Sequence, residues 1–282
     1  DKHCLEVAYP GMKEEAERLP MRTPDQKLES SYDLWALGNI ARILGEDNEA
    51  RVYTDRADSI FMAVWPSEFM TITDDFVKMK GNGLYQGSRW QYRWAVPHCI
   101  DKMIAMEGRE KMEKELEEFF GKHLFNQGNE PDIHTPFLFN IFGNPAETQR
   151  LVRALLTDDE MIHIYGGNAE YPEPFVGRAF RNAPDGLAPE MDEDDGTMSA
   201  WYIFSSMGFY PVVVGDATYE IFSPLYDKIR IKNGESDISI KTRSRKSPDD
   251  IIRGIYVNGR PMDGYRISHE DLSGKCRIII EY

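Results

Sequence analysis

Apolar residues recur three or four positions apart along most of the chain up to about residue 211, which is the spacing of amphipathic helices. A strongly charged helix is expected after Gly108, and the stretch 197–208 is apolar nearly all round, which indicates a buried helix. The remaining predicted helices lie at about 28–44, 50–65, 97–106, 135–142 and 147–156. The pattern therefore predicts a mainly helical body.

The first residues do not share this periodicity. Proline removes a backbone donor and clashes with the preceding turn, so several prolines close together disfavour a continuous helix. Residues 1–24 are therefore expected to be an irregular lead-in, interrupted at Pro10, Gly11, Pro20 and Pro24.

The pattern changes after Pro211, where short β-branched runs alternate with turn residues. The pairs Asn233-Gly234 and Asn258-Gly259 are typical of tight hairpins. The runs lie at 212–214, 219–223, 227–232, 237–242, 251–259 and 276–282. We therefore predict a helical portion over 1–211 and a β-rich region over 212–282. Helices separated by long polar loops favour an α/α toroid, whose loops at one rim carry the chemistry.

Charge narrows the choice of partners. The 282 residues carry 33 Lys and Arg against 48 Asp and Glu, a formal net charge of −15. This excess argues against a nucleic-acid binder, which needs a basic surface, and against attraction to an anionic membrane. No apolar run approaches the roughly 20 residues of a membrane helix. Cys4, Cys99 and Cys276 are too dispersed for a metal motif or a disulfide framework.

The N-terminal sequence has no initiating Met and no readable signal peptide. We expect the chain to be a piece of a longer protein. The sequence of this end leaves the cellular location undetermined.

Aromatic and planar polar side chains concentrate between Leu84 and His98. Aromatic faces beside amide and guanidinium groups suit a sugar, whose C–H faces stack while its hydroxyls form hydrogen bonds. An aromatic helix start packed into the core explains the same composition equally well.

A second segment, Gln127–His134, offers amide and carboxylate oxygens, the ligands that Ca²⁺ prefers. It lacks the EF-hand pattern, and a helix N-terminus with Asp132 in the first turn is the simpler interpretation. The segment Ser31–Trp35 places a carboxylate between two aromatic residues, which suits either a cap at a helix start or a group that faces substrate.

Acidic residues cluster between Glu190 and Asp195, directly before the apolar helix at 197–208. A solvated charge run is the usual meaning of such a cluster. A buried helix would draw some of these carboxylates toward the core, where their pKa values would shift as they do in acid/base sites. We favour the functional interpretation. The sequence has no GxSxG motif, phosphate-binding loop or dinucleotide-binding glycine pattern.

Several short motifs follow one another in a specific order. They are Tyr-Asp-Leu-Trp at 32–35, Gln-Gly-Ser-Arg-Trp-Gln-Tyr at 86–92, Val-Pro-His at 96–98, Gly-Asn-Glu-Pro at 128–131, Gly-Asn-Pro-Ala-Glu-Thr-Gln at 143–149, Asp-Glu-Asp at 192–194, Gly-Thr-Met-Ser-Ala-Trp-Tyr at 196–202 and Met-Gly-Phe-Tyr-Pro at 207–211. In this order the chain resembles the catalytic half of glycoside hydrolase family 92, the calcium-dependent, inverting exo-α-mannosidases.

The resemblance implies that residues 1–211 are part of an (α/α)₆ barrel, with β structure after it. It also implies that an N-terminal β-sandwich domain and the first part of the barrel are missing from this chain. The family suggests an extracellular or periplasmic location.

The resemblance also implies roles for single residues. Asp194 would be the general base that activates water, with Asp192 as its close partner. Asn129 and Glu130 fall in the block associated with the calcium ion, and Glu130 is alternatively a sugar contact. The wall of the mannose pocket would be formed by Trp90, Tyr92 and His98.

One departure from the family bears directly on the reaction. Gln86 stands where the family has a Glu that acts as general acid, and an amide cannot supply that proton. A leaving group that is already stable as an anion needs no proton, so we hypothesise α-mannosyl phosphodiesters such as mannose-1-phospho-6-mannose as substrates.

The alternatives are an ordinary α-1,2-mannosidase of N-glycans and a catalytically weak mannose-binding member, although retention of Asp192 and Asp194 argues against the latter. Cys99 and Met191 also depart from the pattern, which affects the expected local loop geometry.

Overall fold

The structure is a computed structural model that describes residues 2–72, 84–85, 87–158, 162–163, 175–184, 186–187, 191 and 193–282. The chain forms two compact units. The first comprises Asp1–Asn126 and Ile164–Pro174, and the second comprises Gln127–His163 and Phe175–Tyr282. These units group residues by compactness. They do not test the predicted boundary between a helical portion and a β-rich region at residue 211, which stays a prediction.

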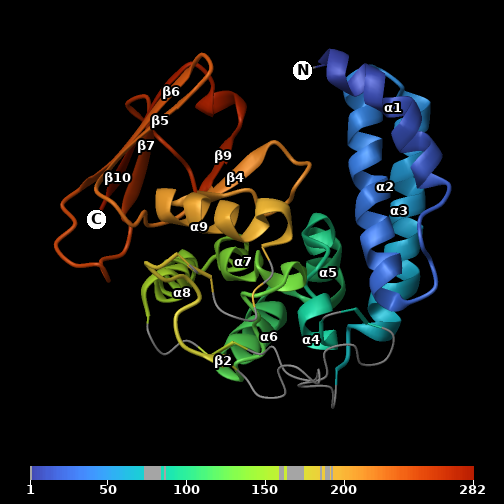
Figure 1. Ribbon diagram of the computed structural model, residues 1–282, viewed down its shortest axis with the longest axis horizontal. Helices are drawn as coiled ribbons and strands as arrows, with labels where there is room; N and C mark the ends of the chain where they lie inside the picture. The colour runs from blue at the N-terminus through green and yellow to red at the C-terminus, as the bar shows by residue number, and fades with distance from the viewer. Residues whose placement is uncertain are drawn as a thin grey trace. The chain divides into compact units, whose positions relative to one another are not determined.

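The described part of the first unit is helical, and its longest helices, α2 and α3, lie side by side (Figure 1). The helix α2 ends where the sequence predicts, at Gly45, which adopts a left-handed conformation with φ of 89°. Gly38 permits close packing of α2 on α3, because a Cβ there would lie 2.8 Å from the Thr54 hydroxyl oxygen. The elements are α1 Lys2–Ala16, α2 Pro24–Leu44, α3 Asp47–Glu68, α4 Arg89–Tyr92, η1 Pro97–Cys99, α5 Ile100–Glu107 and α6 Arg109–Gly121.

The expectation of an irregular lead-in is wrong, since α1 is a helix with Pro10 inside it. Tertiary contacts outweigh the cost of that proline. The Tyr9 hydroxyl donates to Glu49 at 2.6 Å, and Lys13 pairs with the same carboxylate at 3.2 Å. Tyr9 and Ala16 are buried in a hydrophobic cluster with residues of α2 and α3.

The predicted helices of the second unit are present. The stretch 135–142 forms a 3₁₀ turn followed by a short helix, and 147–156 lies inside α8. The expected burial of 197–208 holds for one face only: Trp201 is fully buried, but Ile203 is 54% exposed. The elements are η2 Glu130–Asp132, η3 Thr135–Phe137, α7 Leu138–Phe142, α8 Pro145–Thr157, η4 Asp194–Gly196 and α9 Thr197–Met207.

The β-rich C-terminal region contains a three-stranded and a five-stranded sheet (Figure 1). The three-stranded sheet has the order β3-β4-β9, with β3 Phe209–Tyr210, β4 Thr218–Ile221 and β9 Arg266–Ser268. The five-stranded sheet has the order β5-β6-β10-β7-β8, with β5 Lys228–Asn233, β6 Ser236–Arg243, β10 Lys275–Glu281, β7 Gly254–Val257 and β8 Arg260–Pro261. A short pair, β1 Ile162–His163 and β2 Phe175–Val176, and the 3₁₀ turn η5 Glu270–Leu272 complete the unit as described.

Strand β10 runs parallel to β6 and antiparallel to β7, and one face of the sheet packs into a cluster that includes Ile238, Ile240, Ile278 and Ile280. The predicted hairpin pairs are confirmed. Asn233-Gly234 connects β5 to β6, and Asn258 and Gly259 both have positive φ between β7 and β8. The valine run 212–214 is not a strand, since the chain turns there between β3 and β4.

In the parts of the chain that the structure describes, none of the helices is both long enough and apolar enough to span a bilayer.

Candidate active site

Asp194 lies on an exposed turn just before α9. Its φ is 44°, and that of Asp195 is 55°, so two consecutive non-glycine residues occupy the left-handed region. Such conformations are strained and concentrate at functional sites, although Asp tolerates them better than most residues. The exposed position corrects the expectation that a buried helix draws this carboxylate inward.

Glu193 holds the turn in place. Its carboxylate accepts a hydrogen bond from the Ser199 amide at 3.2 Å, and its carbonyl accepts one from the Gly196 amide at 3.1 Å. The Thr197 hydroxyl donates to the Asp194 carbonyl at 2.7 Å. A carboxylate near the first turn of α9 is also favoured by the helix dipole. Glu193 therefore has a structural role in this turn, whereas the Asp194 side chain lies exposed at the surface.

The segment that carries Asn129 and Glu130 belongs to the same unit as Asp194. Both residues are half-buried, and Glu130 begins η2, a three-residue 3₁₀ turn that ends at Asp132, rather than the longer helix that the simpler interpretation expected. The indole N–H of Trp201 on α9 donates to the Ile133 carbonyl at 2.8 Å. This bond ties the helix that follows Asp194 to the segment with the amide and carboxylate oxygens.

Gln127 opens this segment and is fully buried. Among the residues that the structure describes, neither its amide oxygen nor its amide nitrogen has a hydrogen-bond partner. A buried amide without a partner costs free energy, on the order of 1–3 kcal/mol. Its oxygen is therefore available to a ligand. The sequence placed Gln127 in the candidate calcium segment but did not single it out as a ligand, because burial and lost partners are not visible there.

No cluster of at least three His, Cys, Asp or Glu side chains that could hold a metal ion occurs among the described residues. Asp192 and Gln86 lie outside the described residues. Amide oxygens, such as those of Gln127 and Asn129, are also ligands of Ca²⁺, and a count of His, Cys, Asp and Glu side chains leaves them out.

The aromatic segment of the first unit is closely packed. Trp90 and Tyr92 are buried on the short helix α4, where Ser88 and Gln91 form a capping box. The Tyr92 hydroxyl donates to the Tyr85 carbonyl at 2.7 Å. Gly87 is required here, because a Cβ would lie 2.7 Å from the Tyr92 ring. The two residues that flank position 86 are therefore held by Tyr92.

His98 stacks on Tyr32, with ring centroids 4.5 Å apart, and contacts the Trp35 ring at 5.3 Å. Neither ring nitrogen has a hydrogen-bond partner in the described part of the chain. Burial, with a smaller contribution from Lys102, lowers the pKa of His98 to about 3. The imidazole is therefore neutral at physiological pH and has a donor and an acceptor available for a ligand hydroxyl. Tyr32 and Trp35 lie well inside α2, so the segment 31–35 is not a helix start.

This lowered pKa predicts a pH dependence of stability. Between about pH 6.5 and pH 3 the unfolded chain binds a proton at His98 that the folded chain does not, so stability falls as pH falls. The contribution to the free energy of unfolding lost between pH 6.5 and pH 5 is at most about 2 kcal/mol. Urea midpoints at pH 7 and pH 5 are expected to differ less in His98→Phe than in the wild type. An equal difference in both proteins would contradict the assignment.

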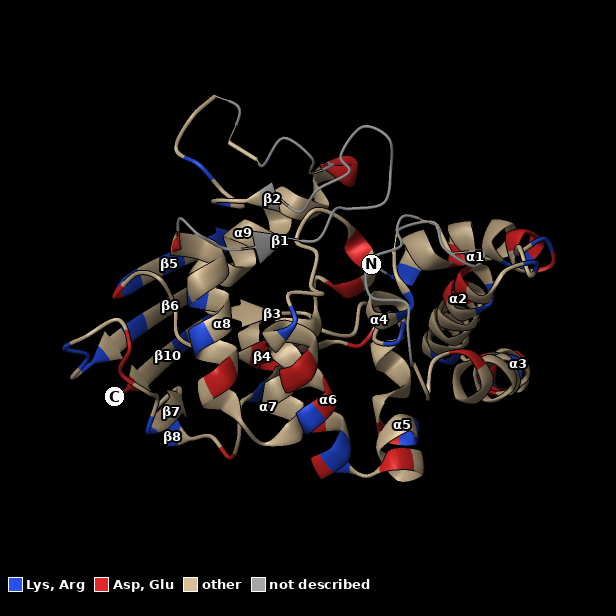
Figure 2. Cartoon of the chain, turned by 90° about the horizontal axis from the view of Figure 1, so that it is seen from below, with Lys and Arg blue, Asp and Glu red and all other residues tan. Residues whose placement is uncertain are grey.

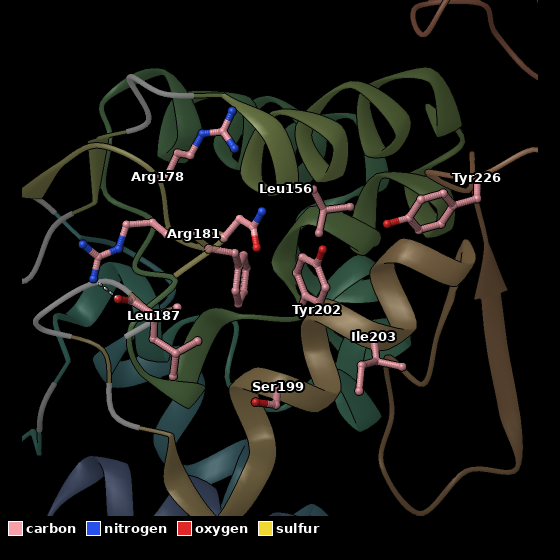
Figure 3. A pocket seen from close by; sticks show the side chains of 11 residues that line it. Leu156, Arg178, Arg181, Leu187, Ser199, Tyr202, Ile203 and Tyr226 are labelled. Atoms are coloured by element: carbon pink, nitrogen blue, oxygen red, sulfur yellow. Dashed lines mark hydrogen bonds between the residues drawn. The ribbon is translucent and has the colours of Figure 1, made fainter. Parts of the chain in front are cut away.

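A pocket of about 610 Å³ opens on the exposed face of α9 (Figure 3). The Arg181 guanidinium there donates to the Leu187 carbonyl at 2.6 Å, and Phe180 stacks on Trp201. Tyr202, Tyr226 and Asn182 also line the pocket. None of the candidate site residues that the structure describes lines this pocket.

The candidate site residues divide between the two units. Asp194, Asn129 and Glu130 belong to the second unit, and Trp90, Tyr92 and His98 belong to the first. Of these, Trp90 and Tyr92 share α4, whereas His98 follows in η1.

The chain combines a helical body with a sheet-rich C-terminal region, and its candidate residues lie on short helices and turns of both units. The model of the glycosyl hydrolase family 92 catalytic domain matches residues 13–159 and 169–281. The chain belongs to this family.

Solved structures agree with this assignment. A family 92 glycosyl hydrolase, ccman5, is 25% identical with a TM-score of 0.83, over 98% of this chain and 42% of that one. A family 92 α-mannosidase from Bacteroides thetaiotaomicron is 25% identical with a TM-score of 0.73, over 92% of this chain and 34% of that one. An inverting mannosidase from Bacteroides thetaiotaomicron VPI-5482 shares the fold at 22% identity and a TM-score of 0.70, over 91% of this chain and 37% of that one. The chain thus spans 34–42% of the length of these relatives. A search of curated protein sequences finds no match.

Proposed function

We propose that this chain is the catalytic portion of a calcium-dependent, inverting exo-α-mannosidase that prefers α-mannosyl phosphodiesters. Family membership and the likeness to an α-mannosidase support the sugar and the reaction class. The observation that carries the leaving-group preference is Gln86 at the position of the general acid, in a chain that keeps an exposed carboxylate at Asp194. The helices would form part of an (α/α)₆ barrel.

In this mechanism Asp194 removes a proton from water as the water oxygen attacks the anomeric carbon. The bond between that carbon and the phosphate oxygen breaks, and its electron pair leaves with the phosphate monoester. A phosphate monoester has a second pKa of about 6, so it is stable as an anion and needs no proton from residue 86. Asp192 would help to orient the water.

The aromatic residues would bind the sugar. Trp90 and Tyr92, which are buried on α4, would form the apolar wall behind the mannose. Neutral His98, with its unpartnered ring nitrogens, would exchange hydrogen bonds with mannose hydroxyls.

The unpartnered amide of Gln127 fits a calcium site in this block. Asn129, Glu130 and Gln127 would hold the ion through oxygen atoms. Bound calcium would supply Lewis-acid and template chemistry toward the vicinal hydroxyls of mannose.

The leaving-group proposal predicts that Gln86→Glu raises turnover of one substrate and not of the other. Turnover of α-1,2-mannobiose by the full-length protein should rise about tenfold or more, because the new carboxyl can protonate a sugar alkoxide. Turnover of mannose-1-phospho-6-mannose should not rise, since a carboxylate placed near the departing phosphate repels it.

The comparison of kcat/KM for both substrates, in the wild type and in Gln86→Glu, tests the proposal. If the wild type has a kcat/KM on α-1,2-mannobiose that equals or exceeds its kcat/KM on mannose-1-phospho-6-mannose, the protein is an ordinary mannosidase instead. Mannose binding without release of mannose from either substrate would identify a catalytically weak binding member.

A further inference from the structure

Lys and Arg positions recur along three neighbouring strands of the five-stranded sheet, β5, β6 and β10 (Figure 2), and their register places them on one face. Lys228 on β5 lies opposite Lys241 on β6. Further along β6, Ser239 lies between Arg230 on β5 and Arg277 on β10. Asp237 lies between Lys232 on β5 and Lys275 on β10. We call the six exposed cations the basic face: Lys228, Arg230, Lys232, Lys241, Lys275 and Arg277.

The sheet core lies on the opposite side. Ile238 and Ile240 alternate with Ser239 and Lys241 along β6 and are buried. The basic face therefore points away from the hydrophobic cluster and toward solvent.

Ion pairs within the protein leave most of this charge uncompensated. Arg230 forms a bidentate pair with Asp237, at 2.8 and 2.6 Å. Within the described parts of the chain, the other five cations form no ion pair. Directly opposed like charges, such as Lys228 and Lys241, destabilise a sheet. Six cations and one carboxylate give this surface a local charge of +5 in a chain whose net charge is −15.

The basic face is also hollowed. A shallow groove of about 500 Å³ runs over it and is lined by five of the six cations together with Ser239 and Asn258. Lysine and arginine contact phosphate oxygens by charge-assisted hydrogen bonds, and serine and asparagine add neutral donors. None of the described lining residues is aromatic.

We propose that the basic face binds the phosphate groups of an anionic glycan, the polymer whose mannosyl phosphodiesters the active site would cleave. The inference rests on the proposed function for the identity of the glycan. Charge complementarity identifies the phosphate as the group that is bound. A groove without aromatic side chains lacks the stacking surfaces of single-stranded nucleic-acid sites and the aromatic or aliphatic residues that enter a membrane interface.

A polymer that carries several phosphodiesters would engage the basic face with one group and the active site with another. Binding at two sites of one chain raises apparent affinity through effective concentration. The basic face would thus lower KM for the polymer and leave turnover of a small phosphodiester unchanged. Salt would weaken this contribution, because the cations are exposed.

The test uses the full-length protein and compares Lys241→Ser/Arg277→Ser with Arg150→Ser/Arg153→Ser. The control removes the same charge from helix α8 of the same unit. Binding is measured on immobilised phosphomannan and on the same mannan after removal of its phosphates, in an Asp194→Asn background that prevents cleavage. We expect the first variant to bind phosphomannan about tenfold more weakly and the control to bind like the parent. Thermal midpoints of both variants report whether folding is retained.

Equal binding to phosphorylated and dephosphorylated mannan, or equal binding by the two variants, would overturn the inference. Stronger binding to phosphatidylserine vesicles than to phosphomannan would overturn it in favour of a membrane surface. Turnover of mannose-1-phospho-6-mannose, measured with Asp194 intact, is expected to be the same in Lys241→Ser/Arg277→Ser and the wild type. Absence of that turnover in the wild type would refute the proposed function, whereas the binding comparison would still decide the role of the basic face.

Discussion

Replacing Asp194 by Asn is expected to lower kcat on α-mannosyl phosphodiesters by about 10²–10⁴-fold, the usual contribution of a general base. Asn has nearly the shape of Asp and also tolerates the left-handed conformation found here, with φ of 44°. The turn before α9 should therefore persist while the ability to accept a proton from water is lost. Release of mannose under saturating substrate, measured with the full-length protein, gives kcat directly.

The neighbouring carboxylate provides a matched control. Asp195 has φ of 55° and is also exposed, so Asp195→Asn makes the same chemical change in the same backbone conformation. Its kcat is expected to stay close to that of the wild type. An equal loss in both variants would implicate the turn as a whole, and a loss confined to Asp195→Asn would identify Asp195 as the base.

Local sequence rules were sufficient for most elements. The spacing of apolar residues located α2, α3 and α5 to α9 but not α1, and the Asn-Gly pairs located two β turns. The rules failed where distant contacts decide the outcome. Pro10 lies inside a helix because Tyr9 and Lys13 both contact Glu49, a contact that helix propensity does not register. The apolar composition of α9 did not reveal that one face remains open to solvent.

The candidate site was predictable only as a set of motifs. Motif order indicated Asp194, Asn129 and Glu130, and the structure adds that all three belong to one compact unit. The sequence could not indicate that Gln127 is buried without a partner, or that His98 stacks on Tyr32 across a separation of many residues. Both features depend on which side chains the fold brings together and which polar atoms it leaves unpaired.

The segment with the aromatic candidates depends on a buried cation, Arg93. The side chains of Arg93 and Glu107 are almost fully buried, and the Arg93 guanidinium pairs with both Glu107 and Glu115. It also donates to the Phe69 and Met70 carbonyls, the latter at 3.1 Å. Burial raises the pKa of Glu115, and the nearby guanidinium opposes this shift. One side chain thus satisfies two carboxylates and two backbone carbonyls.

Arg93→Met is therefore expected to destabilise the first unit by about 3–5 kcal/mol. Methionine fills a similar volume, but it leaves the buried Glu107 carboxylate with the exposed Lys111 as its one charged partner among the described residues, and it leaves both carbonyls without this donor. Unfolding of the full-length protein in urea, followed by far-UV circular dichroism, should show an earlier transition for this variant.

Lys114→Met serves as the control. Lys114 lies on α6, the helix that carries Glu115, and pairs with Glu110 on its exposed surface. Exposed pairs of this kind contribute little to stability, so no measurable change is expected. Unchanged stability in Arg93→Met would mean that water or relaxed side chains satisfy the two glutamates. The expected loss would instead show that this buried network holds α4 and its neighbouring aromatic residues in place, so that the wall of the proposed sugar site depends on Arg93 although Arg93 contacts no sugar.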